Sequence, residues 1–406
     1  MGGCQRQDVI RGRGRGRGGL AVAVGALLTV VSAAADAADL VNRGGTSNVP
    51  TLQGRVHYIK PTSASCPSGV NCFCNTGTDC KLPGTGTITG TVVIDRSGVN
   101  LDCQNRIIQA PRFANSLQQC TSSSECGQHS SGAPGHVCVN GYCQLGNLAG
   151  INIGGPLAVD DGSININVEA TGYVQDVTVR NCVVKSFAHG YRVDGFEGDN
   201  GLDNLDIVSN TFRGNFSGVH IAATDGTVLN ANSVRDNYTD GMFLDYNWSL
   251  QIVWNTINAN AKRQILTDAM GGSRTNRWLE ITGNLAQSTP GWTWFEPIYI
   301  IDLDGTANGQ CDPSSSACDL LFASNEVWAE TGAETVALRE SFAATRPAVR
   351  FTDNVLVNSK LGVNDVRLDS FQLRPRCWEK NNRCFHAGIP TVCLPALLFV
   401  PGDCWY

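Results

Sequence analysis

Ionisable residues recur within or just after short apolar segments between residues 190 and 370. His220 and Tyr246 could give or take a proton, and Arg192 or Arg339 could neutralise a carboxylate. A base, a proton donor and a cation are the groups that lyases and epimerases use to remove the proton beside a uronic acid carboxyl group. Arg192, His220 and Tyr246 are therefore candidate catalytic residues for that chemistry.

Two carboxylates, Asp194 and Asp245, are further catalytic candidates and suit a different reaction. Hydrolysis of a glycosidic bond uses two carboxyl groups about 5 to 9 Å apart. Asp194 and Asp245 could meet that spacing if they lie two structural repeats apart. The residue types leave both reactions open. For any one of these side chains, an ordinary polar position on an outer surface is the plainer interpretation.

Candidate substrate-binding residues lie close to these segments. Trp292 and Trp294 belong to the stretch TPGWTWFEP, and Asp268, Tyr299 and Arg339 follow or end apolar segments. Exposed rings beside polar groups suit stacking on the faces of sugar rings. Packing of the two tryptophans against the rest of the chain is an equally good interpretation.

The elements that must position these residues form a repeat built on asparagine. An alternating apolar segment precedes each repeated Asn and an apolar pair follows it, at Asn181, Asn210, Asn232, Asn255, Asn284, Asn325 and Asn354. The spacing is 22 to 41 residues, and a second apolar segment follows each Asn. A two-residue alternation with dense glycine indicates short strands, and a period of this length indicates a solenoid. The sequence therefore predicts an all-β coil, a parallel β-helix.

Stacked rungs of such a coil would place the Asn residues above one another at a corner. Each amide could then donate to and accept from its neighbours, and we expect the Asn residues themselves to adopt the left-handed backbone of a tight corner. The same alignment predicts an inward column of Val193, Ile221, Leu244, Leu266, Ile300, Leu338 and Leu368. It predicts an outward face that carries Arg192, His220, Phe243, Thr267 and Tyr299.

With these repeats, and with the entry stretch GTGTITGTVVIDRSGVNLDCQNRIIQ, the chain resembles the right-handed parallel β-helix proteins of the pectate-lyase-like superfold. The resemblance covers residues 85–375 and implies the right-handed coil. The catalytic signatures of that group are not intact. For example, Arg346 is followed directly by Pro347, so the pattern R-x-P-x-x-R is not matched.

The 17 cysteines indicate disulfide bonds rather than a metal site, because the chain has only six histidines to share in metal binding. Cys4 lies in the predicted targeting segment, and the rest cluster in four groups apart from Cys103 and Cys182. We predict a Cys-rich N-terminal segment over 38–84, a coil over 85–375 with a disulfide-stapled insertion over 113–147, and a Cys-rich C-terminal cap over 376–406.

Residues 1–37 have the pattern of a secretory signal peptide, with a basic start, a short apolar run and small residues before a cleavage site. No later segment is long and apolar enough to span a membrane. The formal net charge of −6 argues against nucleic acid as a partner. Asn-x-Ser/Thr sequons at Asn215, Asn237 and Asn247 would be glycosylated only in a eukaryotic host.

These observations favour a secreted, monomeric, carbohydrate-active β-helix protein that acts on a polysaccharide. Lyase or epimerase chemistry is the first expectation, and hydrolysis is the second. The alternative is a non-catalytic glycan-binding or adhesion protein of the cell surface. No cofactor is indicated with certainty, and Ca²⁺ stays open because it could bridge acidic side chains to an acidic glycan.

Overall fold

A computed structural model describes the strands and most corners of this chain within Val49–Tyr406, which forms one compact unit. The described residues are 56–59, 71–73, 79–82, 85–94, 97–110, 121, 136–139, 142–145, 149–153, 157–160, 165–168, 174–194, 202–245, 247–268, 279–288, 299–304, 320–330, 333–339, 349–359, 366–368, 377–378 and 381–391. The predicted signal peptide, most of the predicted insertion and the end of the predicted cap lie outside them. The described part of the chain has no helix, so it contains no helix that could cross a membrane.

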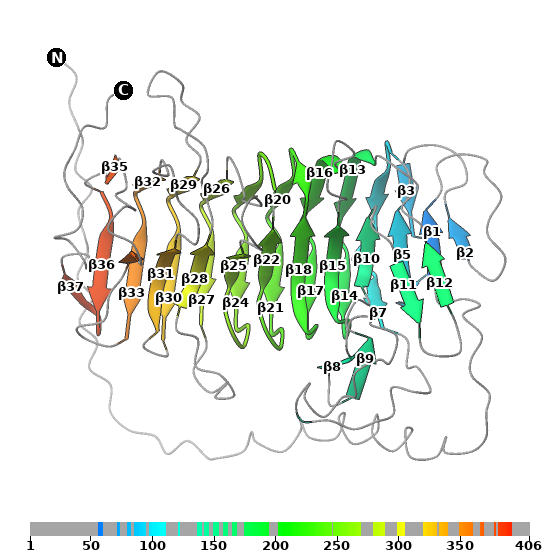
Figure 1. Ribbon diagram of the computed structural model, residues 1–406, viewed down its shortest axis with the longest axis horizontal. Helices are drawn as coiled ribbons and strands as arrows, with labels where there is room; N and C mark the ends of the chain where they lie inside the picture. Colours follow the sequence, from blue (N-terminus) through cyan, green and yellow to red (C-terminus); the bar gives the residue numbers. More distant parts are fainter. Residues whose placement is uncertain are drawn as a thin grey trace, which may run out of the picture. The chain divides into compact units, whose positions relative to one another are not determined.

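Three parallel sheets of 11 strands each make up the coil (Figure 1). Sheet A contains, in spatial order, β2 (Asn71–Phe73), β1 (Val56–Ile59), β5 (Thr91–Ile94), β10 (Ala149–Ile153), β15 (His189–Asp194), β18 (Ser217–Ala222), β22 (Met242–Asp245), β25 (Ile265–Asp268), β28 (Tyr299–Asp304), β31 (Glu334–Arg339) and β34 (Val366–Leu368).

Sheet B contains β3 (Asp79–Lys81), β6 (Asn100–Asp102), β13 (Gln175–Arg180), β16 (Leu202–Val208), β20 (Val228–Asn230), β23 (Gln251–Val253), β26 (Leu279–Thr282), β29 (Leu320–Ala323), β32 (Val349–Thr352) and β35 (Cys377–Trp378), with β19 (Thr224–Asp225) beside β16. Sheet C contains β4 (Thr87–Thr89), β7 (Ile107–Gln109), β14 (Val183–Lys185), β17 (Thr211–Arg213), β21 (Ser233–Arg235), β24 (Thr256–Asn258), β27 (Leu285–Gln287), β30 (Glu326–Ala329), β33 (Val355–Asn358), β36 (Arg383–His386) and the antiparallel end strand β37 (Ile389–Thr391).

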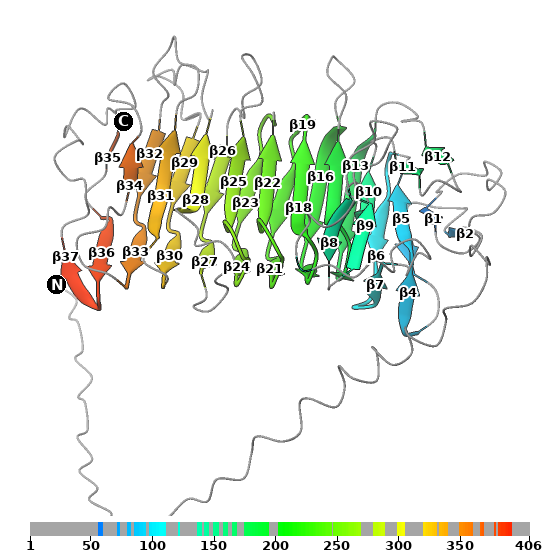
Figure 2. The same cartoon turned by 60° about the horizontal axis from the view of Figure 1, so that its bottom comes forward.

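The chain visits the three sheets in the order B, C, A, and each such circuit makes one rung. Figure 1 shows the strands of sheet A from β5 to β31 side by side in the order of the sequence, and Figure 2 shows the same stack after a turn of 60°. Two antiparallel hairpins lie outside the three sheets, β8 (His136–Val139) with β9 (Tyr142–Leu145) and β11 (Leu157–Asp160) with β12 (Asn165–Val168). The prediction of an all-β parallel coil is confirmed. Its sheets also take in strands before residue 85 and after residue 375.

The strands are short, two to seven residues long, because each corner needs a change of direction. In sheet C, β14, β17, β21 and β24 each bury only their middle residue. These middle residues are apolar and stack rung upon rung inside the coil, so burial of one narrow column replaces the core of an ordinary globular domain. In sheet B, Phe322 and Phe351 stack inside the coil in the same way, with nearly parallel rings 4.8 Å apart.

An amide ladder follows the inside of the corner between sheets B and C. In each rung the side-chain oxygen of one Asn accepts bonds from the backbone N–H and side-chain amide of the Asn in the preceding rung, as Asn232 does from Asn210. The ladder consists of Asn210, Asn232, Asn255, Asn284, Asn325, Asn354 and Asn382. Six of these residues were predicted from the repeat, and Asn382 was missed.

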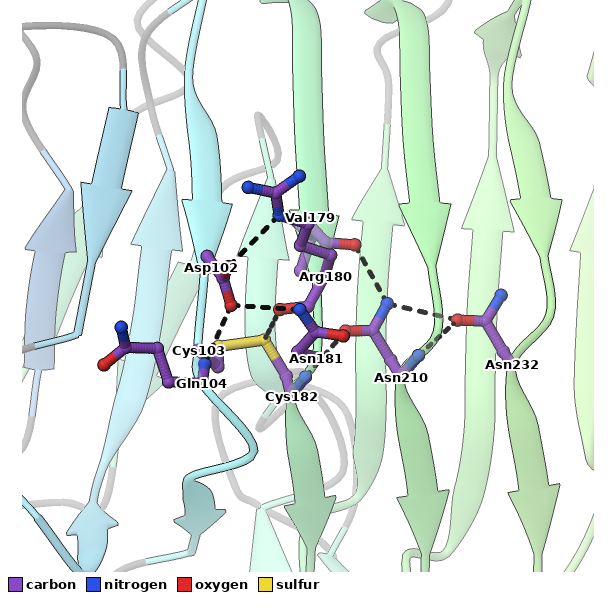
Figure 3. The surroundings of a disulfide bond; sticks show 9 residues. All are labelled: Asp102, Cys103, Gln104, Val179, Arg180, Asn181, Cys182, Asn210 and Asn232. Carbon is purple, nitrogen blue, oxygen red and sulfur yellow. Dashed lines mark hydrogen bonds and ion pairs between the residues drawn. A yellow bond between two sulfur atoms is a disulfide. The ribbon is translucent and has the colours of Figure 1, made fainter.

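The prediction that Asn181 begins this ladder is wrong. Arg180 pairs with Val208, so Cys182 stands in register with Asn210, and its N–H donates to the Asn210 side chain at 2.9 Å. Cys182 forms a disulfide with Cys103 in the preceding rung (Figure 3). Asn181 lies one position earlier and donates to the Asp102 carboxylate. A covalent bond therefore continues the ladder where the amides end.

The left-handed residue at this corner is also not the ladder Asn. Positive φ angles occur at the residue before it, including Ser209, Ala231, Trp254 and Gly283. The ladder Asn residues keep their side chains inside, because the preceding residue makes the turn.

Shorter amide ladders hold the other two corners. Asn215, Asn237 and Asn260 are linked in this way between sheets C and A, and Asn247 bonds to Thr224 between sheets A and B. Asn215, Asn237 and Asn247 are fully buried. The interpretation of these three residues as glycosylation sequons is therefore wrong, since an acceptor amide must be reachable from solvent.

Candidate functional site

The outer face of sheet A brings together several of the predicted catalytic residues. One outward column runs across successive strands through Asn152, Arg192, His220, Phe243, Leu266 and Asp302. Neighbouring strands in a sheet are about 4.8 Å apart, so Arg192 and His220 are direct neighbours. The structure thus places a cation beside an imidazole, both half-buried, in a column whose members Asn152 and Asp302 are buried.

Three rings line up across this face. The ring of His220 lies edge-on to His189 at 5.1 Å and edge-on to Phe243 at 4.9 Å, measured between ring centroids. Such edge-to-face contacts hold the imidazole between two other rings. His189 was not among the predicted site residues, although its ring contacts that of His220.

Acidic residues occupy a second outward column at the carboxyl ends of the same strands. Asp194 and Asp245 both pair with Ala222, so they lie two strands apart, as the repeat predicted. Asp245 is 7% exposed and pairs directly with Asp268 on β25. Arg339 pairs with Asp304 further along this column. The backbone register places these residues, and among their side chains the structure describes that of Asp245.

A charged triad lies on the same face and was not predicted. The Arg263 guanidinium donates to Asp240 in the preceding rung at 2.8 Å and to Asp302 in the following rung at 3.2 Å, so one cation bridges two carboxylates and the triad spans three successive rungs. The side chains of Arg263 and Asp302 are 19% and 2% exposed. Burial alone would lower the pKa of Arg263, but the two carboxylates outweigh it and raise the pKa. The guanidinium of Arg263 is therefore held in ion pairs with Asp240 and Asp302.

Glycine is the sequence signal that could have found the missed residues. Gly190, Gly218 and Gly241 stack at the start of the sheet A strands, and a Cβ on Gly190 would lie 2.6 Å from the Gly218 carbonyl oxygen. The residues directly before these glycines are His189, Ser217 and Asp240. A search for the residue before each stacked glycine would have identified His189 and Asp240.

The predicted inward column is wrong at two rungs. Thr267, not Leu266, pairs with Leu244 and is fully buried, whereas Leu266 pairs with Phe243. In the next rung Leu303 takes the inward place, and Tyr299 pairs with Glu334 on β31. A register shift of one residue reverses the face of every side chain, which is why Thr267 points inward.

Three predicted residues, Tyr246, Trp292 and Trp294, lie outside the described residues. Within the described ranges, no group of three or more His, Cys, Asp or Glu side chains could hold a metal ion. Cys80 and Cys384 each take part in a disulfide as well, in addition to the Cys103–Cys182 pair.

Comparisons with known proteins concern the coil. Residues 158–291 match the family model described as the right handed beta helix region. No curated protein matches the chain. Among solved structures, a tailspike protein gp49 from Acinetobacter baumannii bacteriophage Fri1, described as a capsular polysaccharide depolymerase, shares 11% identity over 71% of this chain and 50% of its own, with a TM-score of 0.31.

A polygalacturonase from Erwinia carotovora ssp. carotovora shares 10% identity over 84% of this chain and 97% of its own, with a TM-score of 0.28. This chain spans about half the length of the tailspike protein. The family match and the three stacked parallel sheets agree on the architecture. The fold is a right-handed parallel β-helix.

Proposed function

We propose that the outer face of sheet A binds a polysaccharide and performs acid–base chemistry on it. The observation that carries the proposal is the adjacency of Arg192 and His220 on neighbouring strands, with the ring of Phe243 on the next. A polymer that runs along the coil axis meets a new set of side chains about every 4.8 Å. An extended repeating ligand therefore fits this surface better than a small molecule does.

Lyase or epimerase chemistry fits these residues best. Imidazole is the side chain that most often transfers protons near neutral pH, so His220 would take the proton beside a uronate carboxyl group. Arg192 would neutralise that carboxylate and stabilise the developing negative charge. Arg263 is less suited to this task, because two protein carboxylates already occupy it.

Assays of the purified chain on uronic acid and neutral polysaccharides would test this proposal. A lyase produces a conjugated double bond, an epimerase inverts a sugar centre without cleavage, and a hydrolase releases reducing ends without a double bond. We expect His220→Ala to lower kcat by about 10² or more, as for loss of a general base. Asp206→Asn, on the outer face of sheet B, is the control and should leave kcat unchanged. Equal turnover by His220→Ala and the unaltered chain would refute the role of His220.

Hydrolysis is the second candidate, because Asp245 and Asp268 are paired in backbone register on adjoining strands. Retaining glycosidases hold their two carboxyl groups about 5 Å apart. Reducing ends without a double bond, abolished by Asp245→Asn or Asp268→Asn but not by His220→Ala, would select this reaction. Glycan binding with no product from any polysaccharide would instead select the non-catalytic function.

A further inference from the structure

We propose that Trp254 forms a second glycan-binding platform, at the corner between sheets B and C and separate from the face of sheet A. Trp254 directly follows β23 and is 64% exposed. An indole left in water at the end of a strand needs an explanation, because burial of its apolar area would be favourable. Two features of the backbone show that this exposure is built into the corner.

The first feature is the conformation of Trp254 itself. Its φ angle is +56°, in the left-handed region that bulky residues avoid at a cost of about 1 to 2 kcal/mol. The described residues in the same corner column of other rungs are small or carry short polar side chains: Asn181, Ser209, Ala231, Gly283, Ser324 and Asp353. Trp254 is held in this conformation by its N–H bond to Thr282 and by the ladder at Asn255. Backbone strain of this kind is frequent at binding sites.

The second feature is the backbone surface at Gly283 on which the indole packs. A Cβ on Gly283, in the next rung, would lie 2.6, 2.7 and 2.9 Å from Cε3, Cζ3 and Cδ2 of Trp254. All three atoms belong to the six-membered ring, so this ring lies directly over the Gly283 backbone. Any larger residue at 283 would displace it. The coil thus supports one side of the ring and leaves the rest open to solvent.

The surroundings indicate a sugar rather than a protein partner. Along the corner beyond Gly283 lie the exposed residues Ser324 and Asp353, and Glu280 and Thr282 lie on the strand before it. A single ring among small polar groups does not provide the buried apolar core of a protein interface. It does suit one sugar ring, whose C–H face stacks on the indole while its hydroxyl groups bond to oxygen acceptors.

The charges at this corner select a neutral glycan. Glu280 lies one rung beyond Trp254 and Asp353 three rungs beyond it, so a polymer that runs along the corner passes both carboxylates. They would repel a uronic acid polymer while accepting bonds from hydroxyl groups. This distinguishes the platform from sheet A, where Arg192 and His220 lie half-buried on the outer face. The platform depends on no chemistry at sheet A, and it would hold the protein on a neutral polysaccharide.

Isothermal titration with laminarin and hydroxyethylcellulose as neutral probes, and polygalacturonate as the acidic probe, would test the platform. We expect the full chain to bind at least one neutral probe, and Trp254→Ala to weaken that binding roughly tenfold or more, which corresponds to about 1.4 kcal/mol. Trp248→Ala is the matched control, because Trp248 is an exposed indole at the other end of β23, and its binding should equal that of the unaltered chain.

Gly283→Ala provides an independent test, since it keeps the indole but removes the backbone surface on which it packs. It should also weaken binding of the neutral probe, at temperatures where circular dichroism shows that the variant is folded. Neutral-probe binding that is absent from the full chain, or equal in Trp254→Ala and the full chain, would overturn the proposal. Loss of polygalacturonate binding in Trp254→Ala would also overturn it, because that result would connect Trp254 to an acidic ligand.

Discussion

Two neighbouring side chains on strand β15 show how polar groups differ in burial between the outer and inner faces of sheet A. Arg192 points to the outer face, whereas its neighbour Tyr191 is fully buried inside the coil. The Tyr191 hydroxyl has no hydrogen-bond partner within the described part of the chain. A buried hydroxyl without a partner costs free energy, because it has given up its bonds to water. Tyr191 therefore contributes through its ring, which lies 5.9 Å from that of Phe212.

We expect Tyr191→Phe to leave the free energy of unfolding unchanged or to raise it by about 1 kcal/mol, because the substitution removes only the buried hydroxyl. Burial raises the pKa of Tyr191 well above its ordinary value. The native chain therefore keeps this proton while the unfolded chain releases it above about pH 10, so stability falls as the pH rises beyond that value. Tyr191→Phe should lack this part of the fall. Urea unfolding at neutral and alkaline pH would measure both effects, and a loss of more than 1 kcal/mol at neutral pH would contradict them.

The triad at Arg263 leads to a second expectation for a single residue. Arg263→Met should lower the free energy of unfolding by about 3 to 5 kcal/mol, because Asp240 and Asp302 would lose the cation that balances them in a largely buried place. Lys262→Met removes the neighbouring, exposed cation and should change stability by less than about 0.5 kcal/mol. Denaturant titrations of both variants make the comparison, and similar effects would show that the triad is not important for stability.

At the scale of elements, the corners rather than the strands set the geometry of the coil. Three-residue strands have little pairing of their own, but each corner between sheets B and C is tied to the next by an Asn that is bonded on both sides. Asn255, for example, donates to Asn284 and to the carbonyl of Leu229, and its oxygen accepts from Asn232. One side chain thereby satisfies backbone groups that would otherwise be buried without partners.

Asn255→Ala should therefore cost about 2 to 5 kcal/mol, since it leaves the Asn232 N–H and the Leu229 carbonyl without their bonds. Asn230→Ala is the matched control, because Asn230 is a half-buried residue of β20 on the outer face of sheet B. It should cost less than about 0.5 kcal/mol. Chemical denaturation would distinguish the two, and equal costs would mean that the ladder contributes no more than an ordinary surface amide.

At the scale of the whole molecule, stability is a sum over rungs and over the contacts between them. The Cys103–Cys182 disulfide joins two neighbouring rungs that are separated by 79 residues of sequence. It encloses the segment that contains both antiparallel hairpins, and so it holds the coil together across its largest interruption. The continuous ladder begins on the C-terminal side of this bond.

Replacement of both cysteines, Cys103→Ala with Cys182→Ala, should destabilise the coil by about 4 kcal/mol, from the closure of a loop of this length in the unfolded chain. The effect should be local, because rungs contact only their neighbours. In hydrogen exchange, β6, β7 and β10 should lose protection while β23, β24 and β25 keep it. Uniform loss of protection along the coil would contradict this view of the molecule as a stack of separate rungs.

The recurrence of Asn within an alternating apolar frame was sufficient, without coordinates, to predict the coil, its parallel sheets and six ladder residues. This worked because stacked rungs place equivalent residues in equivalent surroundings, so the physical repeat appears directly in the chain. Cys182 broke the pattern by occupying an amide position as half of a disulfide. No feature of the sequence around Asn181 indicates that a cysteine takes the place of the ladder asparagine in this rung.

Only the tertiary structure decided which residues share the outer face of sheet A. The register at Thr267 and Tyr299 depends on how many residues each corner absorbs, and a difference of one residue reverses the side to which a strand residue points. The triad of Asp240, Arg263 and Asp302 draws on three rungs, so its members carry no common pattern in the sequence. Local alternation determines that a strand forms, whereas contact between rungs determines what lies beside it.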